Sequence, residues 1–148
     1  MKIKNIWILY GKCISSKYKG GLLYYTYFAK IDKVPDDYIN LIIIRFPPKW
    51  LDINKYLNTY IVKELSPSQE LLLKYKKDNN WSEYVIQFYE EMDYRKDMVN
   101  MLKRLRKVLY KGIDICLICY EKDYKRCHRS LIGEYFEEEG VKWEEIYT

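Results

Sequence analysis

Residues 113–147 read IDICLICYEKDYKRCHRSLIGEYFEEEGVKWEEIY and contain a strand–helix–strand pattern. Residues 113–120 are a mostly apolar run, typical of a buried strand. A helical pattern covers about residues 128–139, Gly140 is expected to end it, and residues 141–147 are a last strand. Strand, helix and strand with short connections require parallel pairing and a right-handed crossover. This segment therefore predicts an α/β fold.

The rest of the chain is consistent with that fold class. We expect a single domain with three layers, in which a mostly parallel sheet carries helices on both faces. The segment 50–64 is expected to be irregular or weakly helical. Strands 41–45, 114–120 and 142–147 are expected to be neighbours, with residues 128–139 crossing between the last two. Further elements are expected as strands at 3–9, 22–30 and 38–45 and as helices at about 67–77, 82–91 and 96–110.

The helix near residue 67 has a clear predicted start. Ser66 is expected to be the N-cap, Pro67 suits the first helical position, and Gln69 completes a capping box with Ser66.

Composition limits the class of protein. The chain has 148 residues, of which 49% are hydrophobic and 32% are charged, so it is long enough for a full core and is not a disordered chain. Its net charge of +5 permits an anionic ligand without requiring one. No apolar run is long enough to span a bilayer, and no signal peptide is expected, so no membrane partner is predicted. Four cysteines without a disulfide-framework spacing indicate a cytoplasmic protein with reduced thiols.

Thiol, imidazole and guanidinium groups are concentrated between the predicted strand and helix. Cys127 is expected at or near the N-cap of that helix, where the helix dipole, Arg126, His128 and Arg129 would lower its pKa. Cys127 is therefore a candidate thiolate nucleophile.

The neighbouring side chains have matching candidate roles. His128 is a candidate general base or metal ligand, and Glu121 and Asp123 could orient either group. Arg129 is a candidate clamp for an oxyanion or phosphate. The structural alternative for the loop is helix capping and salt bridges. Burial of Cys127, or a pKa at or above that of a free thiol, would reject the nucleophile role and leave capping as the better account of this loop.

The two cysteines of the strand are expected to point to opposite faces of the sheet. Alternation places Cys119 on the face of Leu117 and Glu121, and Cys116 on the other face. Both are interpreted first as packing residues, and no cofactor is expected. A metal site of Cys119, Cys127 and His128 remains an alternative, since three such ligands with an open position would suit a catalytic zinc.

Arg45 lies at the carboxyl end of another predicted strand, as Glu121 does. If the two strands are parallel neighbours, Arg45 and Arg129 would converge on one crevice and could hold a phosphate or carboxylate. The alternative is that Arg45 is a solvated side chain. A basic face on the helix 96–110 is interpreted first as an ordinary solvated surface.

These residues resemble a known family, the domain of unknown function 488. The resemblance rests on residues 117–123, on Cys127-His128-Arg129 and on the arginine–proline segment 45–50, and it covers roughly residues 40–146. It implies no established reaction. It implies an α/β fold and a shared site built from Arg45, Cys119, Glu121, Cys127, His128 and Arg129.

The sequence favours an anion-binding, thiol-dependent active site at residues 121–129, with a nucleotide or nucleic-acid end as the expected substrate class. A non-enzymatic module that binds nucleic acid or a protein is the first alternative, and a small zinc protein is the second. The oligomeric state does not follow from the sequence.

Overall fold

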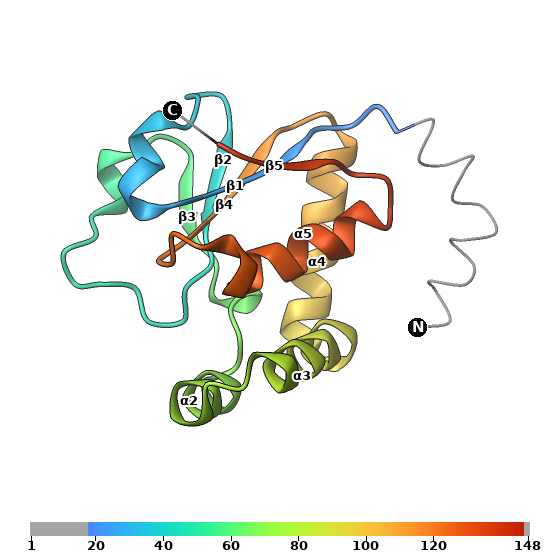
Figure 1. The fold of residues 1–148 in the computed structure, drawn as a ribbon. Coiled ribbons are helices and arrows are strands. Elements are labelled where there is room, and N and C mark those ends of the chain that lie inside the picture. The colour runs from blue at the N-terminus through green and yellow to red at the C-terminus, as the bar shows by residue number, and fades with distance from the viewer. Residues whose placement is uncertain (1–17, 147–148) are drawn as a thin grey trace.

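The computed structural model describes residues 18–146, which form a five-stranded sheet in which every strand is parallel (Figure 1). The expected strand at 3–9 lies outside the described residues. The order across the sheet is β3-β2-β4-β1-β5. The predicted α/β class and parallel sheet are thus confirmed. The strands are β1 (Leu23–Tyr27), β2 (Ile39–Ile42), β3 (Thr59–Ile61), β4 (Ile115–Cys119) and β5 (Trp143–Glu145).

The α-helices pack on one face of the sheet, and two short 3-10 helices, η1 and η2, lie on the other (Figure 1). Apolar side chains of α3, α4 and α5 share one core cluster with Leu23, Leu41 and Leu117. On the opposite face, Ile42 and Ile118 pack against residues of η1 and η2. The helices are α2 (Gln69–Asp78), α3 (Trp81–Tyr94), α4 (Lys96–Tyr110) and α5 (His128–Glu137), and the 3-10 helices are η1 (Phe28–Lys33), η2 (Ile53–Lys55), η3 (Lys63–Leu65) and η4 (Tyr124–Arg126).

The neighbours expected within the sheet are only partly correct. β2 pairs with β4 as predicted, with Ile42 in register with Ile118. β4 and β5 do not pair, because β1 lies between them and pairs with both. The crossover through α5 therefore passes over β1. Gly21, just before β1, lies against the C-terminal end of α4, where its N–H donates to the Leu109 carbonyl at 2.6 Å.

Two local predictions were wrong. The N-cap of α2 is Ser68, whose hydroxyl accepts a hydrogen bond from the Leu71 N–H at 3.2 Å. Ser66 instead donates its hydroxyl to the Lys63 carbonyl, and Gln69 is the first helical residue. The segment 50–64 is also more ordered than expected, since it contains η2, β3 and the start of η3.

None of the helices within residues 18–146 has the length and apolar character that a membrane span requires.

Candidate functional site

A cavity of about 130 Å³ opens where β2 and β4 end. These strands are adjacent, and the chain leaves β2 toward β3 on one side and β4 toward β5 on the other. Ligands in parallel α/β sheets bind at such a divergence, beyond the carboxyl ends of the strands. Arg45 and Glu121, which follow these two strands, both line the cavity. The other lining residues are Ile44, Phe46, Pro67, Leu72, Tyr75, Lys76, Trp81, Tyr84, Tyr120, Arg126, Cys127 and His128.

Cys127 and His128 face the cavity from the start of α5. Cys127 is the N-cap residue, as predicted, but its side chain forms no capping hydrogen bond. Its Sγ lies 3.8 Å from His128 Nδ1. His128 Nε2 contacts the carbonyl oxygen of Ile43, which can only accept a hydrogen bond, so Nε2 carries a hydrogen. Nδ1 is therefore the ring nitrogen that can exchange a proton with the thiol.

Arg129 lies beneath the cavity and is fully buried. One terminal nitrogen, Nη1, lies 3.7 Å from Cys127 Sγ, and Nη2 donates to the Lys122 carbonyl at 3.1 Å. Its Nε has no hydrogen-bond partner, and within residues 18–146 no carboxylate pairs with the guanidinium. Because arginine stays charged and an unpaired buried charge is costly, the Cys127 thiol is the contacting group that can supply the compensating negative charge.

The pKa shifts follow this arrangement. Burial acts to raise the pKa of Cys127, but the hydrogen bond with Cys119 and the positive charges of His128 and Arg129 outweigh it and hold that pKa well below its usual value. Burial acts to lower the pKa of His128, but the charge of the Cys127 thiolate and the hydrogen bond to Ile43 raise it. The two shifts are consistent with a thiolate–imidazolium pair.

Cys127 is buried, and burial was one of the two outcomes expected to reject its role as a nucleophile. The residue is only 2% exposed, so its thiol is not an open surface nucleophile. The capping alternative has no support either, because the side chain caps nothing. The thiol lines the cavity, and reagents small enough to enter the cavity can reach it.

Cys119 and Cys116 lie on opposite faces of β4, as strand alternation predicts. Cys119 belongs to the core cluster under the α-helices and Cys116 to the cluster on the other face. Cys119 Sγ lies 3.6 Å from His128 Nε2, and ligand atoms of Cys119, Cys127 and His128 all lie within 4.8 Å of one another. These three buried residues could therefore hold a metal ion, whereas Cys116 could not join them.

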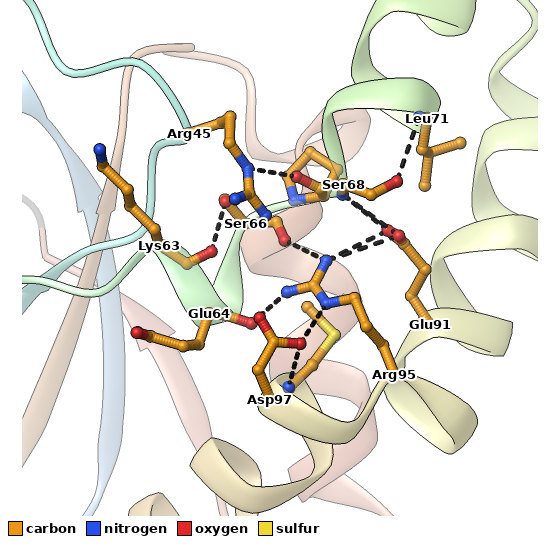
Figure 2. Close-up of polar contacts among 11 residues, drawn as sticks. Arg45, Lys63, Glu64, Ser66, Ser68, Leu71, Glu91, Arg95 and Asp97 are labelled. Carbon is orange, nitrogen blue, oxygen red and sulfur yellow. Dashed lines mark hydrogen bonds and ion pairs between the residues drawn. The ribbon is translucent and has the colours of Figure 1, made fainter.

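Arg45 is held at the cavity wall by the segment before α2 (Figure 2). Its Nε donates to the Pro67 carbonyl at 3.0 Å. That segment is fixed in turn by Arg95, which donates to the Ser66 and Glu64 carbonyls, and by Glu91, which accepts from the Ser68 N–H at 2.7 Å. The buried, hydrogen-bonded segment gives Arg45 a defined position.

A family model described as the active DUF488-N3 subclade, DUF488-N3a, matches residues 24–140. The chain belongs to the DUF488 family. No curated protein and no solved structure matches the chain. The DUF488 match includes every residue of the cavity lining and the buried Arg129.

The resemblance to DUF488 implied a site of six residues, and the structure arranges these residues in two layers. Arg45, Glu121, Cys127 and His128 line the cavity, while Cys119 and Arg129 lie behind it and contact His128 or Cys127. Arg129 is therefore placed to act on the thiol, and the expected convergence of Arg45 and Arg129 on one ligand surface is not seen in the cavity lining.

The two acidic candidates differ in position. Glu121 lies at the cavity mouth, where burial and the charge of Cys127 raise the pKa of its carboxyl group. Asp123 is exposed, accepts a hydrogen bond from the Lys125 N–H at 2.9 Å and does not line the cavity. Its observed contact is a cap for η4.

Several residues that line the cavity were not predicted from the sequence. Tyr75, Lys76, Trp81 and Tyr84 come from α2 and α3, whose connection includes Asn79 in the left-handed conformation. The helical pattern indicated these helices, but no local signal indicates that their junction packs over the ends of β2 and β4.

The basic face of α4 carries less unpaired positive charge than the sequence indicates, because Arg106 forms an ion pair with Glu139 at 2.6 Å.

Proposed function

We propose that this DUF488 protein is a thiol-dependent enzyme that acts on a nucleotide or a nucleic-acid end. The main observation in support of this proposal is the contact between the buried Arg129 guanidinium and Cys127 Sγ at the floor of the cavity. That contact favours a thiolate, which is the reactive form of cysteine.

The other groups of the cavity fit defined roles in nucleophilic catalysis. The thiolate of Cys127 would attack an electrophilic centre of the substrate, forming a bond to sulfur while the leaving group departs. Glu121, whose pKa is raised by desolvation and by the charge of Cys127, would act as the general acid that protonates the leaving group. A water molecule, deprotonated by the Glu121 carboxylate that the first step leaves, would then release the product and restore the Cys127 thiolate and the protonated Glu121.

The cavity lining supports an anionic substrate. Arg45, Lys76 and Arg126 line it, against a single carboxylate, that of Glu121. Tyr75, Trp81 and Tyr120 add aromatic surface that suits a base. A reducing compartment such as the cytoplasm would keep the thiols in the state that this chemistry needs.

The direct test is to trap a covalent intermediate. Purified protein would be incubated with a panel of nucleotides and short oligonucleotides, quenched in acid and analysed by peptide mass spectrometry. A substrate-derived mass on Cys127, and loss of turnover in Cys127→Ser but not in Cys116→Ser, are expected. Turnover that survives Cys127→Ser would reject the thiol mechanism.

A metal centre is the second candidate, favoured by the closeness of Cys119, Cys127 and His128. Their two sulfurs and one nitrogen match the ligand set of a zinc site with an open fourth position. If zinc binds, elemental analysis of purified protein should find one equivalent, and Cys119→Ser should lose it. Cys116→Ser is the matched control and should keep the metal, because Cys116 lies on the other face of β4. Purified protein free of zinc that cannot be reloaded would remove this candidate.

A further inference from the structure

Exposed aromatic rings lead out of the cavity along the surface. Phe46 and Tyr120 line the cavity and are 51% and 43% exposed. The ring of Phe28 contacts Tyr120, with 5.2 Å between ring centroids, and also contacts Trp50 at 5.8 Å. Trp50 is 68% exposed. The exposed rings of Tyr120 and Trp50 are joined by the partly buried ring of Phe28, so the three rings form a continuous aromatic track from the mouth of the cavity to open solvent.

Positive charge lies along the same region. Lys76 and Arg126 are exposed side chains of the cavity lining, and within residues 18–146 neither forms an ion pair. Lys49 is exposed and adjoins Trp50 in the chain. Alternating cations and exposed rings are what a single-stranded nucleic acid requires, since its phosphates need positive charge and its bases stack on aromatic faces. An acidic peptide could form ion pairs with the cations, but its binding would not account for the exposed aromatic rings.

The cavity is too small for more than one unit of a strand. Its volume of about 130 Å³ is close to that of an apolar cavity of about 150 Å³ that holds a single benzene ring. One base or sugar can enter, and neighbouring nucleotides must stay outside. A free mononucleotide could place its base or sugar in the cavity, but it would have no further nucleotide to contact Trp50.

We infer that the substrate is a single-stranded nucleic acid, with the base or sugar of its terminal nucleotide in the cavity and the next nucleotides along the aromatic track formed by Tyr120, Phe28 and Trp50. This inference deepens the proposed function, and it rests on the nucleotide class of substrate named there. The aromatic track would set the preference for a strand over a mononucleotide, while the cavity would select the terminal unit.

Fluorescence anisotropy with labelled hexathymidylate and hexauridylate tests this inference. Trp50→Ala should weaken binding by about 5- to 150-fold, the range expected for one stacked base, and Trp50→Phe should retain most of the affinity. Binding of thymidine monophosphate or uridine monophosphate should be unchanged in both variants. Tyr94→Ala is the matched control, because Tyr94 is 83% exposed and, within residues 18–146, stacks on no ring of the aromatic track, so it should bind as the wild type does.

Three outcomes would overturn the inference: hexanucleotides that bind no tighter than the mononucleotides, a Trp50→Ala variant with wild-type affinity, or equal competition by a hexaglutamate peptide. None of these would affect trapping of an intermediate on Cys127, which tests the proposed function separately. Conversely, Trp50-dependent strand binding with an unreactive Cys127 would uphold the binding site and reject the enzyme.

Discussion

Arg129 and Cys127 show how one buried contact can determine the chemistry of a site. A guanidinium that is fully buried and has no carboxylate partner among residues 18–146 requires another source of negative charge. Cys127 Sγ, 3.7 Å away, meets that requirement only as a thiolate. The same contact therefore concerns both the stability of the folded state and the reactivity of the thiol.

The first prediction concerns the reactivity of Cys127. Iodoacetamide reacts with the thiolate, whose fraction falls as pH drops through the pKa, and the pKa of Cys127 is lowered. The midpoint of its alkylation rate against pH should lie well below the free-thiol value of about 8.5. Cys116, whose pKa burial raises, should not react near neutral pH. Peptide mass spectrometry would follow both thiols.

Arg129→Met should move that midpoint upward, because it removes a positive charge from beside the sulfur. Lys125→Met is the control, since Lys125 is exposed and does not line the cavity. An unchanged midpoint in Arg129→Met would show that the guanidinium does not stabilise the thiolate.

The second prediction concerns the free energy of unfolding. Cys127→Ser would leave Arg129 without a compensating charge, so it should destabilise the protein by about 3 kcal/mol in urea denaturation. Adding Arg129→Met should recover part of this loss, because a methionine needs no counter-ion. Strict additivity of the two substitutions would mean that the residues are not coupled.

The sequence was informative for part of this site. Adjacent cysteine, histidine and arginine after a buried strand predicted a site at the start of a helix, and Cys127 and His128 do line the cavity. The position of Arg129 could not be predicted, because successive helical residues point about 100° apart and the direction of the cavity depends on the packing of α5. Only the structure shows that Arg129 contacts the thiol from below.

Among the secondary-structure elements, sequence prediction succeeded where the apolar pattern was long. α4 spans Lys96–Tyr110 as predicted, because its apolar stripe covers four turns and packs into the core. β3 was missed because it has three residues, and its Tyr60 and Ile61 side chains are exposed at the edge of the sheet. A short edge strand has neither an apolar run nor a buried alternation that could reveal it.

The third prediction concerns the start of α2, where two serines compete as caps. Ser68→Ala should lower the free energy of unfolding by about 1 kcal/mol, because the Leu71 N–H would lose its acceptor. Gln69→Ala should have almost no effect, since Gln69 is an exposed first-turn residue. The reverse ranking in urea denaturation would favour the capping box at Ser66 that the sequence indicated.

At the scale of the whole molecule, the order of the strands in the sheet could not be predicted from local sequence patterns. Short connections predicted parallel strands, but they did not indicate that β1 inserts between β4 and β5. That position depends on a close approach at Gly21, where an added Cβ would lie 2.0 Å from the Ile113 carbonyl oxygen. Its role is visible only once residues far apart in sequence are placed side by side.

The fourth prediction tests this approach. Gly21→Ala should destabilise the protein by about 1–3 kcal/mol, because the backbones of two strands would have to separate. Lys19→Ala, at an exposed position two residues earlier, should be neutral. Equal midpoints for the two variants in urea denaturation would show that the sheet tolerates a side chain there.

The place of β1 between β4 and β5 also has a consequence during synthesis. A ribosome releases β1 early, but both of its partners, β4 and β5, lie some ninety or more residues later. At about 5–20 residues per second, the segment Leu-Tyr-Tyr-Thr-Tyr waits several seconds with both edges unpaired. Unpaired, aromatic strand edges are sites of aggregation. The nascent chain is therefore expected to depend on chaperones until residue 145 has emerged, and slow translation should lower the yield of soluble protein.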